Sequence, residues 1–125
     1  MRTWKVCVLL LIIIGGFAEL KAQQDTIIMV SGEILLGEIK LYDNGIVIIE
    51  TSYSDSDFKI EGDKVAQIST FHQYVILTAH GDRYYGSLAS DKNNPSIVVI
   101  NDAEKGRTKE QFLDILFLKK IDPTF

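Results

Sequence analysis

A repeat of about 50 residues constrains the fold of this 125-residue chain more than any other feature. Gly32 and Gly81 lie 49 residues apart, and Gly37 and Gly86 show the same spacing. A repeat of this length indicates two copies of one structural unit, which bury their apolar faces against each other. A single irregular β-sandwich whose glycines match by coincidence is the alternative.

Apolar runs follow the same spacing. Ile46-Val47-Ile48-Ile49 recurs 51 residues later as Ile97-Val98-Val99-Ile100, and Val65 has its counterpart 50 residues later in Ile115. Two extra residues in the loop around Asn93-Asn94-Pro95 account for the change from 49 to 51. Because units of this size lie near the lower limit for a stable core, we expect the two units to pack together.

Short β-branched and aromatic runs, separated by Gly, Asn and Asp, predict that both units consist of β-strands. No stretch of the sequence shows a sustained helical period. The expected strands are Thr26–Val30, Ile34–Tyr42, Ile46–Thr51, Phe58–Ile60 and Val65–Ser69 in the first unit, and Tyr74–Ala79, Arg83–Ala89, Ile97–Ile100 and Ile115–Leu118 in the second.

Six residues are expected to shape the turns and bends: Gly32, Gly37, Asn44, Gly45, Gly81 and Gly86. The Asn-Gly pair is typical of a type I′ hairpin turn, because both residues accept a positive φ. Alternation along the second strand of each unit puts Gly37 and Gly86 on the inward face, where glycine indicates a bend or a close backbone approach.

Five short strands with such a corner are typical of a small SH3-like or Sm-like barrel. The predicted fold is therefore all-β, with a tandem pair of five-stranded barrels at residues 23–71 and 72–125, after an N-terminal signal peptide at residues 1–22.

The first 22 residues have the pattern of a secretory signal peptide. Arg2 and Lys5 form a short positive segment, and an apolar run from Val6 to Ile14 follows it. This run is too short to span a bilayer, which requires about 20 apolar residues. We expect cleavage after Ala22, with Ala18 as the second choice. An uncleaved N-terminal anchor is the alternative.

Cleavage after Ala22 changes the composition. It removes three basic residues of 13 and one acidic residue of 17, so the net charge goes from −4 to −6. It also removes the only cysteine, Cys7, which precedes most of the apolar run and is not positioned for lipidation. The mature chain then has no thiol nucleophile, and its acidic charge argues against nucleic acid as the partner.

Several segments resemble the N-terminal region of YdiY-like proteins, a bacterial envelope family described as salt-induced outer-membrane proteins of unknown function. These segments are Asp25-Thr26-Ile27, Ser31-Gly32-Glu33, Gly37-Glu38-Ile39-Lys40, residues 50–61, Gly81-Asp82-Arg83-Tyr84-Tyr85-Gly86 and Ile115-Leu116-Phe117-Leu118-Lys119.

The resemblance implies export to the periplasm or the outer-membrane periphery of a Gram-negative bacterium. The family pattern normally continues into an outer-membrane β-barrel, which the 103 residues left after cleavage cannot supply beside the repeat. We therefore expect either a truncated or split version or a free-standing module, with only indirect contact to the membrane. The family provides no catalytic residue to assign.

Asp55, Asp57, Glu61 and Asp63 place four carboxylates within nine residues and are candidate calcium ligands, because Ca²⁺ takes six to eight oxygens. The segment lacks the glycine and the bidentate glutamate that an EF-hand requires at fixed positions. A solvated hairpin loop is the alternative.

No other cofactor or reaction is indicated. His72 and His80 are the only imidazoles, too few for a zinc site without cysteine, and His80 is expected in an exposed turn. The sequence has neither the G-x-S-x-G motif of a nucleophile elbow nor a phosphate-binding loop. We therefore expect a protein that is not an enzyme and needs no cofactor.

Tyr42, Tyr53 and Tyr85 are expected to form an interaction surface, with a protein bound by aromatic contact or by strand addition to an open edge. Scattered aromatics on strands are the alternative. The sequence thus predicts an exported, non-enzymatic interaction module whose partner is an envelope protein or the family's own barrel domain. A small ligand-binding or calcium-binding periplasmic domain is the second hypothesis, and no oligomeric state is predicted.

Overall fold

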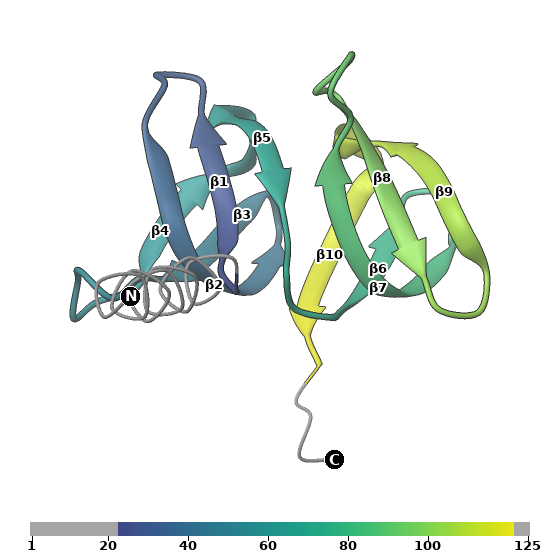
Figure 1. The fold of residues 1–125 in the computed structure, drawn as a ribbon, viewed down its shortest axis with the longest axis horizontal. Helices are drawn as coiled ribbons and strands as arrows, with labels where there is room; N and C mark the ends of the chain where they lie inside the picture. Colours follow the sequence, from purple (N-terminus) through teal and green to yellow (C-terminus); the bar gives the residue numbers. More distant parts are fainter. Residues whose placement is uncertain (1–22, 122–125) are drawn as a thin grey trace, which may run out of the picture.

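The computed structural model describes residues 23–121, which fold into ten strands (Figure 1). The first five are β1 (Asp25–Met29), β2 (Ile34–Asp43), β3 (Ile46–Glu50), β4 (Phe58–Glu61) and β5 (Val65–Ser69). The second five are β6 (Tyr74–Thr78), β7 (Arg83–Ser90), β8 (Ile97–Asp102), β9 (Gly106–Gln111) and β10 (Ile115–Lys120).

The described chain is all-β apart from two short 3₁₀ turns, η1 (Gly62–Lys64) before β5 and η2 (Phe112–Asp114) before β10. Within residues 23–121, no helix is long and apolar enough to cross a membrane. The predicted signal peptide, its cleavage sites and Cys7 lie outside the described residues, as do residues 122–125 of the predicted second barrel.

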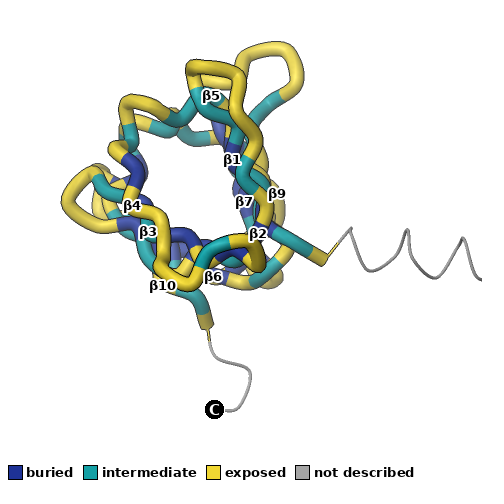
Figure 2. Tube along the Cα trace, turned by 90° about the vertical axis from the view of Figure 1, so that its left-hand side faces the viewer, coloured by how far each residue is buried: buried dark blue, intermediate teal, exposed yellow. Residues whose placement is uncertain are grey.

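The strands follow the period-two burial that their sequences predict. In β3, Val47 and Ile49 are fully buried, and in β8 the same is true of Val98 and Ile100. Alternate side chains of a strand point to opposite faces, and buried and less buried residues therefore alternate along these strands (Figure 2). The buried apolar side chains of all ten strands except β9 join in one core cluster.

Six strands pair in a closed antiparallel ring, in the order β1-β5-β7-β6-β10-β2 and back to β1. Strands β3 and β4 extend the sheet from β2, and β8 and β9 extend it from β7. In the described part of the chain, β4 pairs only with β3, and β9 pairs only with β8. These two strands are therefore the free edges of the sheet.

The strands form two lobes (Figure 1), which we call the first lobe (β1–β5) and the second lobe (β6–β10). The pairing order is β5-β1-β2-β3-β4 in the first lobe and β10-β6-β7-β8-β9 in the second. The last strand of each lobe also pairs with the second strand of the other lobe. Ser69 of β5 lies opposite Ala89 of β7, and Leu118 of β10 lies opposite Tyr42 of β2.

Gly37 and Gly86 lie inside β2 and β7 and not in turns. A Cβ atom on Gly37 would come 2.0 Å from the carbonyl oxygen of Glu50, and one on Gly86 would come 2.0 Å from that of Asn101. Only glycine fits at either position, because the neighbouring strand's carbonyl occupies the space of a side chain.

The other four turn residues lie between strands. Asn44 and Gly45 connect β2 to β3 with φ angles of 52° and 75°, the signs that a type I′ turn requires. Gly32 and Gly81 take φ angles of 95° and 86° in the turns that precede β2 and β7.

β9 is absent from the predicted strands, because Gly106–Gln111 has no alternation of apolar and polar residues. Six residue pairs with β8 hold it in place. Its charged residues suit a strand at the edge of a sheet, where Lys and Arg discourage pairing with other chains.

Candidate functional site

Asp25, the first residue of β1, is a fully buried carboxylate where the two lobes meet. Its Oδ2 accepts hydrogen bonds from the backbone N–H of Ile39 at 2.9 Å and from the hydroxyl of Tyr74. Its Oδ1 accepts from the backbone N–H groups of Phe71 at 2.7 Å and His72 at 3.2 Å. A buried carboxylate is costly unless it is hydrogen-bonded, and these donors meet that requirement.

Tyr74 begins β6 and is itself fully buried. Burial, followed by the hydrogen bond to Asp25, raises the pKa of its hydroxyl, which therefore stays protonated as a donor. The same hydroxyl lies 2.6 Å from the carbonyl oxygen of Ile39. His72 places Nδ1 3.1 Å from Oδ1 of Asp25. Since both oxygens of Asp25 and the hydroxyl of Tyr74 have partners inside the protein, this network suits a structural role at the lobe junction.

The second lobe has a buried carboxylate of its own, Asp102 at the end of β8. It accepts backbone hydrogen bonds from Lys105 at 2.9 Å, Tyr85 at 2.8 Å and Glu104 at 2.7 Å. These bonds, Lys105 first, hold the pKa of Asp102 below its usual value. Asp102 thus organises the β8–β9 turn and is not available as a free acid or base.

The four candidate calcium ligands do not come together. The carboxylate of Asp57 lies 3.3 Å from Nζ of Lys40, which also contacts Glu50 at 3.2 Å. Asp55, Glu61 and Asp63 are exposed. Among residues 23–121, no three of the four candidates place ligand atoms within 4.8 Å of one another.

A different group does place three possible ligand atoms within 4.8 Å: His80, Glu110 and Asp114. Nε2 of His80 lies 3.4 Å from Oδ2 of Asp114, and Glu110 accepts a hydrogen bond from the hydroxyl of Tyr84 at 3.2 Å. Each member therefore has a partner within the protein. The sequence alone does not reveal this group, because Glu110 and Asp114 lie 30 and 34 residues after His80. In addition, Glu110 lies on β9, a strand that the sequence does not predict.

The three candidate interaction tyrosines do not form one surface. Tyr42 is only 8% exposed and stacks on Phe112, with ring centroids 5.7 Å apart, and burial raises the pKa of its hydroxyl. The expectation that Tyr42 belongs to an exposed aromatic surface is wrong. Tyr85 is 49% exposed on β7 of the second lobe.

A β-bulge explains the position of Tyr42. The register between β2 and β3 shifts between Ile39 and Leu41, so Lys40 is an extra residue in β2. A shift of one residue moves every later side chain to the opposite face of a sheet. Tyr42 therefore points inward, although uninterrupted alternation from Ile39 would point it outward.

Tyr53 remains exposed and pairs with a residue that the sequence does not single out. Tyr53 is 58% exposed and Phe58 is 37% exposed, and their ring centroids lie 6.2 Å apart at a tilt of 44°. Phe58 is the first residue of the free edge strand β4. An exposed aromatic pair thus lies beside an unpaired sheet edge.

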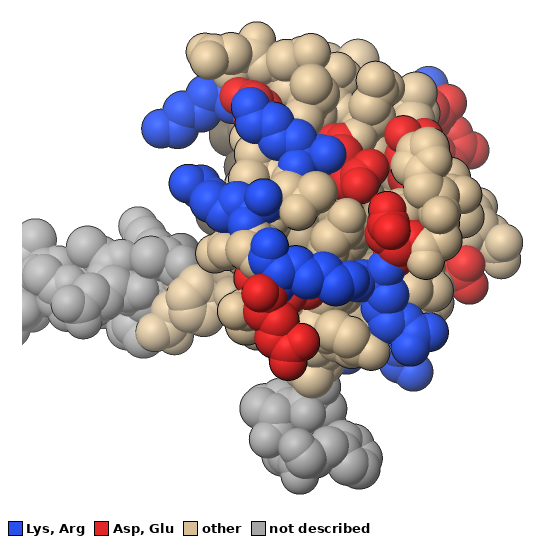
Figure 3. Space-filling model, turned by 90° about the vertical axis from the view of Figure 1, so that its right-hand side faces the viewer, with Lys and Arg blue, Asp and Glu red and all other residues tan. Residues whose placement is uncertain are grey.

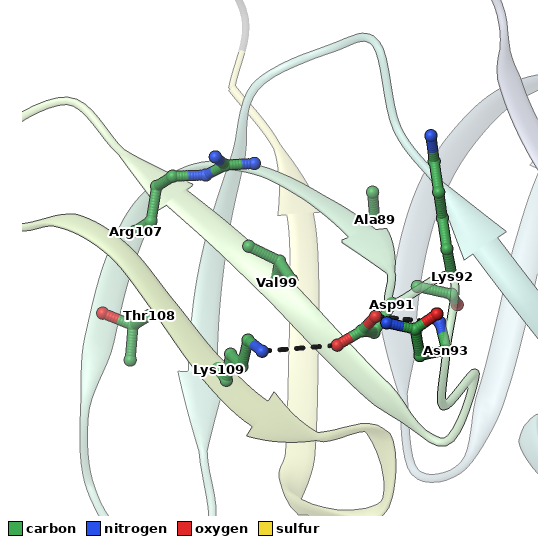
Figure 4. A pocket seen from close by; sticks show the side chains of 9 residues that line it. Ala89, Asp91, Lys92, Asn93, Val99, Arg107, Thr108 and Lys109 are labelled. Carbon is green, nitrogen blue, oxygen red and sulfur yellow. Dashed lines mark hydrogen bonds and ion pairs between the residues drawn. The ribbon is translucent and has the colours of Figure 1, made fainter.

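A cavity of about 570 Å³ lies on the outer face of β7, β8 and β9 (Figure 4). Its lining includes Ala89 and Val99, the cations Lys92, Arg107 and Lys109, and one carboxylate, Asp91. Nζ of Lys109 lies 3.4 Å from Oδ2 of Asp91. The backbone N–H of Asn93, and then Lys109, lower the pKa of Asp91, which stays ionised.

Comparisons of the chain with models of protein families, with curated proteins and with solved structures find no match.

Proposed function

We propose that this chain is an exported, non-enzymatic interaction module of the bacterial envelope that binds a partner protein along the free edge of β4. The observation that carries the proposal is the exposed pair of Tyr53 and Phe58 beside an unpaired strand. An edge strand offers backbone N–H and C=O groups to an extended segment of a partner. The aromatic pair adds apolar contact area at the same place.

The partner in this proposal is an envelope protein or an outer-membrane barrel of the kind that follows this region in YdiY-like proteins. The signal-peptide pattern of residues 1–22 and the resemblance to that family support a location in the periplasm or at the outer-membrane periphery. Cell fractionation with N-terminal sequencing tests the location. We expect a mature N-terminus at Gln23, and a cytoplasmic protein beginning at Met1 would contradict export.

We also infer that the two lobes are a tandem pair of SH3-like units. The common pairing order and the matching close approaches at Gly37 and Gly86 support this interpretation. The reciprocal pairing of β5 with β7 and of β10 with β2 supports it further, because two equivalent units that meet about a two-fold axis exchange the same contacts.

Site-specific photocrosslinking in cells tests the β4 surface. A photoreactive residue at Lys59 faces solvent on the free edge strand, whereas one at Lys119 faces solvent on β10, which has a neighbour on both sides. We expect a discrete crosslinked product from position 59 and none from position 119. A second variant, Tyr53→Ser/Phe58→Ser, should reduce that product. Equal products from both positions, or none from position 59, would overturn the proposal.

A further inference from the structure

The outer faces of the two lobes can be compared position by position where their strand registers correspond, which excludes the bulge residue Lys40. In the first lobe Ile48 of β3 lies opposite Lys59 of β4, and in the second lobe Val99 of β8 lies opposite Lys109 of β9. Glu38 pairs with Glu50 and Ile39 with Ile49 in the first lobe, as Ser87 pairs with Asn101 and Leu88 with Ile100 in the second. The match ends at Ile39, because the bulge in β2 follows directly. These pairs define which side chains occupy the same place in the two lobes.

In the first lobe, this outer face is filled by a closed ion-pair group. Nζ of Lys40 lies 3.2 Å from Glu50 and 3.3 Å from Asp57. The hydrogen bonds to Glu50 and then to Asp57 raise the pKa of Lys40. The lysine side chain lies over the sheet, and its charge is balanced within the protein.

The second lobe has different side chains in this region and lacks the ion pairs that Lys40 makes in the first lobe. Ala89 lies opposite Val99 as Leu41 lies opposite Ile48, so Lys40, the extra residue of the bulge, has no counterpart in β7. Asn101 replaces Glu50, and Arg107 replaces Asp57. The long side chain that covers the sheet in the first lobe is missing, which leaves the cavity of about 570 Å³. Arg107 takes part in no ion pair among residues 23–121.

The cavity combines an apolar floor with a cationic rim. Ala89 and Val99 lie at its centre, and Lys92 and Arg107 extend on opposite sides of them (Figure 4). Lys92 also has no ion-pair partner in the described part of the chain. With Lys109 and Asp91 included, three cations and one carboxylate give a net charge of +2, in a chain whose net charge is −4.

The excess of positive charge belongs to the lining of the cavity and not to the whole lobe. Figure 3 shows Lys and Arg side chains interspersed with Asp and Glu on the right-hand side of the molecule as Figure 1 presents it, where β8 and β9 lie. Residues 82–111 contain five basic and five acidic residues, and one of the acidic residues, Asp102, is buried and bound by backbone N–H groups. An anion that enters the cavity therefore meets a local positive potential.

We propose that this cationic cavity binds a phosphate-bearing ligand. A guanidinium forms two parallel hydrogen bonds to a phosphate, and a lysine adds a mobile positive charge. The floor of Ala89 and Val99 contacts the apolar part of the ligand, and the volume lies within the range of small-molecule sites, about 300–1,000 Å³. The phosphate belongs either to a soluble organic phosphate or to the headgroup of an anionic phospholipid. The proposal does not depend on binding at β4, which lies on the other lobe.

Two binding measurements on the mature chain distinguish these sources. Calorimetric titration with glycerol 3-phosphate tests the soluble ligand. Cosedimentation with vesicles of phosphatidylglycerol in phosphatidylcholine, against vesicles of phosphatidylcholine alone, tests the lipid headgroup. Saturable binding in either arm supports the proposal and identifies the source. The absence of binding in both arms would overturn it.

Variants then test whether the cavity is the site. We expect Lys92→Ala/Arg107→Ala to weaken binding by about tenfold or more, because two charge-assisted hydrogen bonds are lost. The control Lys59→Ala/Lys119→Ala removes the same charge from two exposed positions outside the cavity and should leave affinity within about twofold. Equal weakening by both pairs would indicate a non-specific charge effect and overturn the proposal.

A third variant introduces a lysine and an aspartate beside the cavity, to imitate the ion pair of Lys40 and Asp57 in the first lobe. Ala89→Lys/Arg107→Asp should fill the cavity with an internal ion pair and abolish binding. Its thermal unfolding midpoint should match that of the parent chain, because both positions are exposed. If this variant folds and still binds the phosphate ligand with parent affinity, the cavity is not the site.

Discussion

Tyr74 donates a hydrogen bond to the buried carboxylate of Asp25, and this contact joins β6 of the second lobe to β1 of the first. The two residues are 49 residues apart and each begins the first strand of its lobe, so they occupy corresponding positions. One lobe supplies the acceptor and the other supplies the donor. Two aspartates or two tyrosines could not make the same contact, so a difference between the lobes specifies how they join.

Tyr74→Phe tests this junction. Removal of the hydroxyl deprives Asp25 of one donor in a buried site, and we expect the free energy of unfolding to fall by about 1–3 kcal/mol. Urea denaturation followed by circular dichroism measures the change. The control Tyr85→Phe removes a hydroxyl from an exposed ring on the same lobe and should change stability by less than about 0.5 kcal/mol. Equal effects of the two substitutions would contradict a specific role for the Asp25 contact.

Alkaline pH tests the same contact in another way. The pKa of Tyr74 is higher in the folded protein than the usual value of 10.0, because burial and the Asp25 carboxylate both oppose ionisation. The resulting stability is fully present below pH 10 and is lost as the pH rises above it. We expect the free energy of unfolding to fall above pH 10, and to fall less steeply in Tyr74→Phe than in the parent chain. The free energy of unfolding of Tyr74→Phe should still fall somewhat above pH 10, because the pKa values of Tyr42 and Tyr84 are also raised.

The positions of most strands could be predicted from the sequence, because β-branched runs such as Ile46–Glu50 and Ile97–Asp102 alternate with turn residues. The strand β9 could not, since its stability comes from pairing with β8 and its sequence carries no apolar pattern. Tyr42 was misplaced because a single extra residue, Lys40, reverses the alternation, and nothing in the local sequence marks it.

The junction and the cavity depend on distant residues and were beyond prediction. The donors to Asp25 lie 14 to 49 residues away along the chain, and only the packing of the lobes brings them together. The cavity depends on the small side chain of Ala89 as much as on the presence of Arg107. The spacing of about 50 residues in the sequence does relate some positions of the two outer faces, such as Glu50 to Asn101.

Asp102 contributes to the change in the free energy of unfolding at acidic pH. Its pKa is lower in the folded protein than the usual 3.8, so its contribution is present above that value and is lost as the pH falls through the lowered pKa. Asp102→Asn replaces one carboxylate oxygen with an amide NH₂ group, which cannot accept a hydrogen bond from the backbone N–H groups around it. We expect lower stability at pH 7 and a smaller further loss between pH 7 and pH 3 than in the parent chain. Denaturation of the exposed control Asp63→Asn should follow the parent profile.

Gly37→Ala and Gly86→Ala test the two close backbone approaches. A methyl group 2.0 Å from a carbonyl oxygen forces the neighbouring strand to move, so we expect each substitution to cost about 2 kcal/mol or more. The matched control Ser87→Ala, beside Gly86 on β7, should cost less than either. Similar losses at the two glycines would agree with a common role in the two lobes. A neutral effect at one of them would show that its strand can move aside without cost.

Separate expression of residues 23–71 and 72–121 tests whether the lobes depend on each other. Each half alone would expose the edge of β5 or β10 that pairs across the junction, and the first half would lose the donors from His72 and Tyr74 to Asp25. Since a half of about 50 residues buries a small core, we expect neither half to unfold cooperatively alone. An equimolar mixture should recover the circular dichroism spectrum and the unfolding transition of the intact chain, and Tyr74→Phe in the second half should weaken that association. Two halves that each unfold cooperatively, without associating, would show that the cross-lobe pairing contributes little to the fold.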